Sequence, residues 1–375
     1  MTDTTVTILA TTDLHGLYYG GHITPRPGAG NIARVREFVM HTRHARPDTI
    51  VLDAGDFMGG GIAAHWSNHV GLSSPHIPAL IANGIPYDAM TPGNHDLDTG
   101  EAIMSRYAAE LTAPLIACNV RGIPCLSPYT IIRRGDLRIA VIGVATTETP
   151  LFLHSGARFI PAAQAVREAI SEINSLHRPD LTVGLFHIGP EESAAIARQS
   201  PGLDIIFCGH VHSDIGITRT GTTLIINPGP YGLRIARAEV TLGHPHPGIH
   251  ADIIDLPDLL PDPMPGAIAA FGRQPVTSGP ASLDTLVRTA HLHAYPEAQP
   301  EITPTGIMLP APITMAETFR HLPYDDHILL LAPDETHPHP TSMTTYLHSS
   351  SGDSRIPAAI DPRPLRCHIC PKYYL

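Results

Sequence analysis

The sequence lacks any apolar run that approaches the ~20 residues needed to cross a bilayer. Its first ten residues carry no basic segment ahead of the apolar ones. A membrane-spanning helix and a cleaved signal peptide are therefore not expected. This favours a cytoplasmic location without a membrane partner.

Basic residues are also scarce. The 375 residues include 24 Lys and Arg against 35 Asp and Glu, which gives a net charge of −11, and no basic block occurs. This balance argues against a nucleic-acid polymer as a partner. A small anion is still compatible with it if bound metal ions supply local positive charge.

Cysteine occurs only five times. Cys118, Cys125 and Cys208 lie in apolar or turn contexts, which favours buried, reduced thiols. Cys367 and Cys370 have the Cys-x-x-Cys spacing, but one such pair without a second is a weak indication of a zinc or redox site. We expect two ordinary thiols there, and the role of the pair stays open.

Histidine, by contrast, is abundant, with 24 residues. It is the commonest metal-binding side chain and titrates near neutral pH. Outside the motifs described below we expect surface positions, including those of His65, His69 and His76.

Apolar β-branched segments alternate with helical patterns over the first two thirds of the chain, which indicates an α/β protein. Strands are expected at 5–11, 48–53, 115–119, 138–144, 181–186, 203–208, 223–227 and 235–242. Helices are expected from about 31, at 78–83, 99–111, 162–176 and 191–199.

Proline divides the chain unevenly, with 17 residues before position 241 and 21 in the 135 residues that follow. Length and composition together predict a first domain at 1–245, a Pro-rich linker at 246–280, and a C-terminal domain and tail at 281–375. In the last part we expect a helix at 282–294 and a strand at 328–332.

Four polar clusters follow expected strands, and a fifth follows the short segment 87–90. They contain Asp13 and His15; Asp56; Asn94, His95 and Asp98; His187; and His210 and His212. Ligands of open α/β sheets collect at the carboxyl ends of strands. Each cluster alone would usually have only a structural role. Because all of them lie at strand ends, we expect them to converge on one site.

Seven of these side chains, Asp13, His15, Asp56, Asn94, His187, His210 and His212, exceed the ligand number of one tetrahedral zinc. They suit two divalent ions, and Mn, Zn, Fe, Co and Ni all accept such N and O ligands. Two ions roughly 3.5–4 Å apart lower the pKa of a bridging water and neutralise phosphate oxygens. His95, with Asp98 to fix its tautomer, is the candidate that protonates a leaving alkoxide.

The order Asp-x-His, Gly-Asp, Gly-Asn-His-Asp, His and Gly-His-x-His resembles the calcineurin-like metallophosphoesterase superfamily. The segments 9–16 and 30–34, and the spacing of His95 and Asp98, resemble its branch of 5′-nucleotidases and 2′,3′-cyclic-nucleotide phosphodiesterases. The resemblance implies a four-layer α/β/β/α sandwich.

The resemblance also implies roles for single residues. Asp13, His15, Asp56 and His212 would hold one metal, and Asp56, Asn94, His187 and His210 the other. His95 and Asp98 would form a catalytic dyad. We expect Asp96 to turn away from the metals and orient a ligand imidazole or the loop backbone.

The C-terminal part resembles the branch less closely. Residues 312–327 and 351–353 resemble parts of its substrate domain, but its Asn-x-Gly-Gly-Ile-Arg segment is missing and the region is short. This predicts a short, degenerate C-terminal substrate domain. Tyr324 is the candidate ring for stacking on a base.

These features predict a hydrolase of small phosphate esters that uses two divalent metal ions, with nucleotides or cyclic nucleotides as the leading substrates. One alternative is the same site acting on a pyrophosphate, a sugar nucleotide or a sulfur ester. A third possibility is a non-catalytic binding module. Such modules usually lose ligands, whereas this sequence has the full set.

Overall fold

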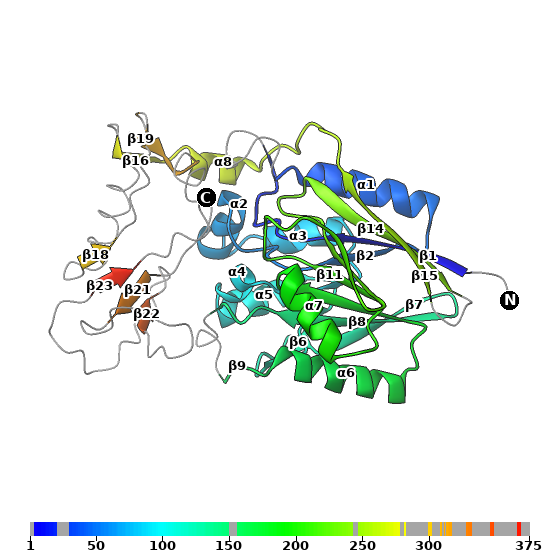
Figure 1. The fold of residues 1–375 in the computed structure, drawn as a ribbon. Helices are drawn as coiled ribbons and strands as arrows, with labels where there is room; N and C mark the ends of the chain where they lie inside the picture. The colour runs from blue at the N-terminus through cyan, green and yellow to red at the C-terminus, as the bar shows by residue number, and fades with distance from the viewer. Residues whose placement is uncertain are drawn as a thin grey trace. The chain divides into compact units, whose positions relative to one another are not determined.

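The computed structural model describes residues 4–20, 30–149, 156–242 and 247–277, and several short segments between 281 and 368. The chain divides into two compact units, Met1–Pro265 and Gly266–Leu375. In the first unit two β-sheets pack face to face, with helices outside them (Figure 1).

The first sheet has seven strands. Its order is β15 (Gly248–Asp255), β14 (Arg234–Leu242), β1 (Thr4–Thr11), β2 (Ile50–Asp53), β3 (Ala89–Met90), β4 (Leu115–Ile116) and β6 (Leu126–Ser127). Pairing is parallel from β1 to β6, whereas β14 and β15 join antiparallel at the other edge. Four neighbouring strands, β1 to β4, therefore end on the same side.

The second sheet has six strands. Its order is β12 (Gly216–Thr220), β13 (Thr223–Asn227), β11 (Ile205–Cys208), β10 (Leu181–His187), β8 (Leu137–Ala145) and β7 (Tyr129–Arg134). The four central strands are parallel, and the two edge strands are antiparallel to them. A short pair, β5 (Val120–Arg121) and β9 (Arg158–Phe159), lies apart from both sheets.

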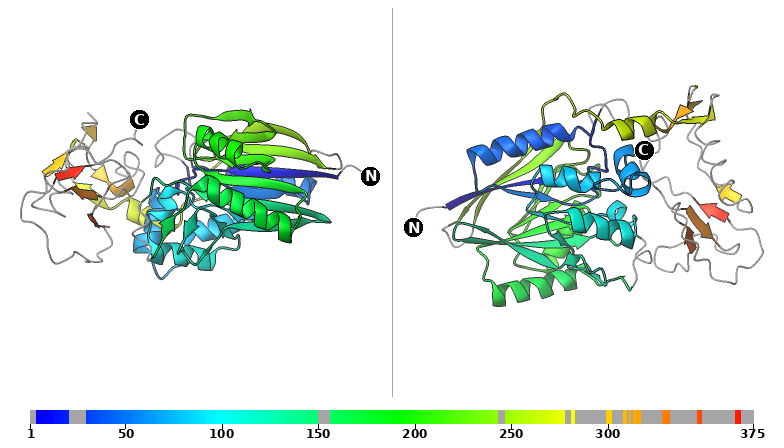
Figure 2. Two further views of the ribbon diagram at one scale, coloured as in Figure 1. Left: turned by 60° about the horizontal axis from the view of Figure 1, so that its bottom comes forward. Right: turned by 180° about the vertical axis from the view of Figure 1, so that it is seen from behind.

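Helices cover the outer faces. Those outside the first sheet are α1 (Ile32–Ala45), α3 (Ile77–Gly84) and α5 (Glu101–Glu110), and those on the second are α6 (Ala162–Leu176) and α7 (Pro190–Gln199) (Figure 2). Shorter helical turns, α2 (Ile62–His65), η2 (Trp66–Val70) and α4 (Asn94–Leu97), follow the ends of β2 and β3. This arrangement confirms the four-layer sandwich.

Strand β8 shows why the layers form. Its residues Ile139 and Val141 lie in the core between the sheets, whereas Ala140, Ile142 and Val144 pack toward α6 and α7. Side chains alternate between the two faces of a strand, so a strand covered on both faces is apolar throughout. Each fully buried Ile or Val contributes about 1.5–3 kcal/mol to stability.

Strand β15 corrects the predicted linker. It pairs with β14 over eight residues, from Arg234–Asp255 to Thr241–Gly248. Its alternate residues Ile249, Ala251 and Ile253 pack against the core between the sheets. Residues 248–255 therefore belong to the first unit, because their alternating apolar face outweighs the proline-rich surroundings. The rest of the domain division stays a prediction.

The second unit is described only in short elements. They are α8 (Gly266–Gly272), β16 (Pro275–Thr277), β17 (Ala281–Ser282), β18 (Gln299–Glu301), β19 (Met308–Leu309), β20 (Ile313–Thr314), β21 (Ile328–Leu331), β22 (Tyr346–His348) and β23 (Arg366–His368). Strand β21 confirms the one expected at 328–332. Most of the helix expected at 282–294 lies outside the described residues, as do Tyr324, residues 351–353 and Cys370.

Three further expectations can be compared with the described residues. Cys118 and Cys208 are buried free thiols as predicted, whereas Cys125 is free but only half-buried. His76 is fully buried, so its expected surface position was wrong. Over the part of the chain that the structure describes, no helix combines the length and apolarity that a bilayer crossing requires.

His76 is buried because it joins a local polar network. Its Nε2 donates to Asn68 Oδ1 at 2.8 Å, and the Asn68 amide donates to the Met58 carbonyl at 3.3 Å. Burial, aided by the charge of Arg106, lowers the pKa of His76 to about 4 from its ordinary 6.5. Between these two values the unfolded chain binds a proton that the folded chain does not.

We therefore expect the free energy of unfolding to fall by up to about 3 kcal/mol from this residue as the pH drops from 7 to 4. The contribution is fully present above pH 6.5. His76→Gln should remove this part of the pH dependence, measured by urea unfolding of chelator-treated protein at several pH values. The control is His41→Gln, at an exposed position on α1. Parallel curves for wild type and His76→Gln would contradict the prediction.

Candidate metal centre

The seven residues predicted as ligands meet at one edge of the sandwich. Asp13 and His15 follow β1, Asp56 follows β2, and Asn94 begins the turn after β3. From the second sheet, His187 ends β10, and His210 and His212 follow β11. The carboxyl ends of parallel strands in both sheets therefore supply the site, as expected for open α/β sheets.

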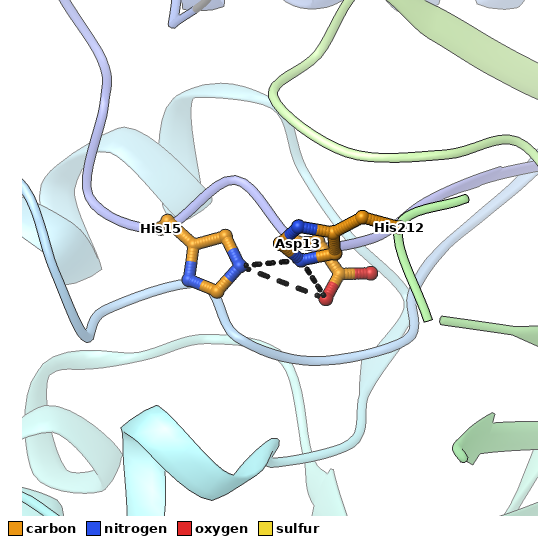
Figure 3. A group of neighbouring side chains, drawn as sticks. All are labelled: Asp13, His15 and His212. Carbon is orange, nitrogen blue, oxygen red and sulfur yellow. Dashed lines mark hydrogen bonds and ion pairs between the residues drawn. The ribbon is translucent and has the colours of Figure 1, made fainter. Parts of the chain in front are cut away.

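Asp13, His15 and His212 form the first group. The Nε2 atoms of the two imidazoles lie 3.0 Å apart, and Asp13 Oδ1 lies 3.3 Å from His212 Nε2 and 3.7 Å from His15 Nε2. Figure 3 shows the two rings and the carboxylate pointing toward one another. These donor atoms are close enough together to hold one metal ion.

Asp56, His187 and His210 form the second group. His187 Nε2 lies 3.1 Å from Asp56 Oδ2 and 3.3 Å from Asn94 Oδ1, so the amide oxygen joins the same group. The His210 backbone N–H donates to the Asp13 carboxylate, at 3.1 Å from Oδ2. This hydrogen bond links the second group to the first.

Asp56 lies between the groups. Its Oδ2 is 3.1 Å from His187 Nε2 on one side and 3.8 Å from His15 Nε2 on the other. Its Oδ1 accepts the backbone N–H of His95 at 2.9 Å. One oxygen is thus held by the loop while the other is available to both groups, as a bridging carboxylate requires.

The hydrogen bond of His187 tests whether a cation fits this site. Its Nδ1 donates to the Ala54 carbonyl at 2.7 Å, so its Nε2 faces the Asp56 and Asn94 oxygens. Oxygen acceptors on that side require a positive centre, either a proton on Nε2 or a metal ion. The donor set therefore fits a divalent metal, which would take the place of that proton.

Two further imidazoles among the predicted ligands also have a polar partner at one ring nitrogen. His212 Nδ1 lies 3.4 Å from the Tyr231 hydroxyl, and His210 Nε2 lies 3.3 Å from Glu148 Oε2. Such outer hydrogen bonds fix the tautomer and the ring orientation of metal-binding histidines. Neither Tyr231 nor Glu148 was singled out from the sequence.

Burial and charge act together on the protonation of the site. Burial lowers the pKa of His15 to about 3, although the nearby Asp56 carboxylate acts in the opposite direction. For Asp56, burial alone would raise the pKa, but the His187 and His95 imidazoles hold it well below its usual range. Burial would lower the pKa of His187, yet Asp56 raises it to about 10. A metal ion bound here would meet an ionised carboxylate at Asp56 and would replace the proton on His187.

The backbone around the site is strained. Asp13, His15, Asp56 and His210 have φ values of 54°, 50°, 54° and 68°, in the left-handed region that residues other than glycine rarely adopt. Such strain costs on the order of 1–3 kcal/mol for each residue and is commonly found at functional sites. Four of the seven predicted ligands carry it.

Glycines make room for this geometry. A Cβ on Gly93 would lie 2.1 Å from Asp56 Oδ1, and one on Gly55 would lie 2.6 Å from His187 Nδ1. Gly93 thus makes room for the Asp56 carboxylate, and Gly55 makes room for the His187 ring.

The turn that contains His95 is held by Asp96, whose carboxylate binds the backbone as expected. It accepts the N–H of Gly93 at 2.9 Å, of Met58 at 2.7 Å and of Phe57 at 3.3 Å. Burial raises the pKa of Asp96 to about 6, and the charge of Asp56 adds to this effect.

His95 lies within this turn, and Asp98 directly follows it. The His95 ring centroid is 5.3 Å from that of His15, so His95 borders the first group. Asp98 follows α4, and its Oδ1 accepts the Thr149 hydroxyl at 2.5 Å. Thr149 and Glu148 follow β8, so the strand-end rule that located the ligands applies to these two residues as well.

Gly93→Ala tests the geometry around Asp56. The added methyl group would displace the Asp56 carboxylate, so we expect the affinity for Mn or Zn to fall by at least about tenfold. Metal content after dialysis and calorimetric titration measure the effect. Gly84→Ala is the matched control, because its Cβ would meet nothing within 4 Å. Equal metal binding by the two variants would show that the position of Asp56 does not control the site.

The sequence and the fold both match those of known proteins. The family model for calcineurin-like phosphoesterases matches residues 6–214. The 5′-nucleotidase of Bos taurus is 28% identical over 192 residues, which cover 48% of this chain and 32% of that protein. The match thus spans only about a third of the length of that relative.

Solved structures show the same fold. A 5′-nucleotidase precursor from Thermus thermophilus has a TM-score of 0.66 at 18% identity, covering 87% of this chain and 75% of its own. The sulfate thiohydrolase SoxB of Thermus thermophilus has a TM-score of 0.62 at 18% identity, covering 87% and 75%. At this identity the likeness concerns the fold alone.

The family match and the structure therefore lead to one conclusion. The matched residues make up more than half of the chain and contain all seven predicted ligands together with His95 and Asp98. The chain belongs to the calcineurin-like phosphoesterase family.

Proposed function

We propose that the protein is a hydrolase of small phosphate esters that depends on two divalent metal ions. The observation that carries this proposal is the position of Asp56 Oδ2 between His187 Nε2 at 3.1 Å and His15 Nε2 at 3.8 Å. One carboxylate oxygen shared by two groups of ligand atoms is what a pair of neighbouring metal ions requires.

Asp13, His15, Asp56 and His212 would hold one ion, and Asp56, Asn94, His187 and His210 the other. When bound, the two ions would neutralise phosphate oxygens and activate a water for in-line attack. Mn, Zn, Fe, Co and Ni all suit these N and O donors.

The charge of the donor set favours a phosphate substrate. The two carboxylates, Asp13 and Asp56, would offset two of the four positive charges of a metal pair, and Asn94 adds none. About two positive charges would remain for a phosphate group in a buried setting, where electrostatic interactions are stronger than in water. Four carboxylates would instead cancel the charge of the two ions, and the centre would lack this preference.

His95 and Asp98 would act on the leaving group. The His95 backbone is anchored to Asp56 Oδ1, which fixes the ring beside the metal ligands. The imidazole would donate a proton to the departing oxygen, and the Asp98 carboxylate would orient the ring. Proton transfer from a positioned imidazole commonly contributes a factor of about 10²–10⁴.

Nucleotides and cyclic nucleotides are the proposed substrate class. The relative from Bos taurus is named as a 5′-nucleotidase, which supports this choice. A stacking role for Tyr324, a short C-terminal substrate domain and a cytoplasmic location stay predictions from the sequence.

An alternative keeps the metal centre and changes the ester. Pyrophosphates, sugar nucleotides and sulfur esters are its candidate substrates. The short C-terminal region motivates it, and the shared fold with a sulfate thiohydrolase is compatible with it.

The activity is tested with the metal-loaded protein. We expect about two metal equivalents per chain and hydrolysis of bis-p-nitrophenyl phosphate that a chelator abolishes. Asp56→Asn should lower both metal content and kcat. His95→Ala should keep both metals and lower kcat by about 10²–10⁴. The control is His41→Ala on the surface of α1. Unchanged turnover in both site variants would refute the proposal.

A substrate panel separates the two candidate functions. Nucleoside 5′-phosphates, 2′,3′-cyclic nucleotides, sugar phosphates, nucleoside diphosphate sugars and a thiosulfonate ester are compared by kcat/KM with Mn, Co, Ni and Zn. We expect the nucleotides to rank first. A higher kcat/KM for a diphosphate or a sulfur ester would favour the alternative.

A further inference from the structure

Thr149 links the two sheets beside the metal centre. It lies in the loop after β8 of the second sheet, and its Oγ1 is 2.5 Å from Asp98 Oδ1 in the turn after β3 of the first sheet. The two residues are 51 positions apart, and both are half-buried. No other role has been assigned to this hydroxyl.

The direction of the hydrogen bond follows from the chemistry of the two groups. An ionised carboxylate only accepts hydrogen bonds, so the Thr149 hydroxyl donates its one proton to Asp98. The Asn94 carbonyl lies farther from Thr149 Oγ1, at 3.4 Å. A hydroxyl–carboxylate distance of about 2.5–2.7 Å is typical of a strong, charge-assisted hydrogen bond.

Asp98 is thereby fixed at two points. Its backbone N–H donates to the Asn94 carbonyl at 2.8 Å, and its side chain is held by Thr149. The first bond fixes the backbone of Asp98, and the second limits rotation of its carboxylate. The orientation of one carboxylate oxygen therefore also determines where the other oxygen points.

We propose that Thr149 is a positioning residue for hydrolysis, whose hydroxyl holds the Asp98 carboxylate in the orientation that supports His95. This inference rests on the proposed function, because it needs the His95–Asp98 dyad to act on the leaving group. It adds that both sheets orient the dyad, because the Thr149 hydroxyl that holds Asp98 comes from the second sheet.

The position of Thr149 gives this role a distinct kinetic signature. Thr149 acts through Asp98 on protonation of the leaving group, so its loss should matter most when that group is a poor one. A p-nitrophenolate leaves without much help from an acid, whereas a ribose alkoxide needs a proton. A residue that only stabilised the fold would affect both substrates equally.

The test compares Thr149→Val, which removes the hydroxyl at nearly constant shape, with Thr149→Ser, which keeps it. Thr147→Val is the matched control at an exposed position of the same loop. For a nucleoside 5′-phosphate we expect Thr149→Val to lower kcat by about tenfold, with KM and metal content unchanged. For p-nitrophenyl phosphate the loss should be smaller. Thr149→Ser should restore most of kcat.

A double-mutant cycle adds a second readout. In an Asp98→Ala background, Thr149→Val should have no further effect on kcat, because its target is already absent. Additive losses would overturn the inference. So would a loss of bound metal, or equal losses for both leaving groups, since either would indicate general damage.

The outcomes separate the inference from the function on which it rests. If the wild type is active and Thr149→Val matches Thr147→Val, the inference is wrong and the proposed function stands. If the metal-loaded wild type hydrolyses no ester of the panel, both are wrong. Thermal unfolding of each variant identifies any that is misfolded. If Thr149→Val is misfolded, Thr149→Ser is compared with Thr147→Val instead. The inference then requires that Thr149→Ser keeps most of the wild-type kcat.

Discussion

The whole site depends on the face-to-face packing of two parallel-rich sheets whose strands end at the same edge. The core between them is built from alternate apolar residues of both sheets, such as Ile8 and Ile50 against Val183 and Phe207. This packing fixes the relative position of loops that are distant in the chain. The contact of 3.1 Å between Asp56 and His187, one from each sheet, exists only because the sheets are held in this way.

Much of the site could be predicted because the rule that places it is local. Six of the seven predicted ligands lie at the ends of apolar strands that the sequence predicts, and the carboxyl ends of such strands converge in α/β folds. What could not be predicted depends on packing between distant segments. The contact of Thr149 with Asp98 and that of Tyr231 with His212 join residues whose spacing carries no signal. The role of Gly93 beside Asp56 arises in the same way, from the approach of two loops.

The predicted linker was wrong because the proline content of the region concealed the alternation of its apolar residues. Ile249, Ala251 and Ile253 alternate with polar residues, as expected for a strand. Because prolines surround them, the end of the first domain was predicted too early in the chain. Pairing with β14 gives this segment a full ladder of backbone hydrogen bonds. An alternating apolar face is direct evidence of a sheet partner, whereas proline content reports only on the flanking turns.

The division of ligands between the sheets also has a consequence for the order in which the molecule can be built. Asp13, His15, Asp56 and Asn94 come from the first hundred residues, whereas His187, His210 and His212 come about ninety residues later. Strand β1, near the start of the chain, pairs on one side with β14, which begins at Arg234. A nascent chain that ends before residue 212 therefore carries only part of the donor set, and β1 still lacks one of its two neighbouring strands. Binding of metal by both groups would require synthesis of nearly the entire first unit, so the complete site would form late in the maturation of the chain.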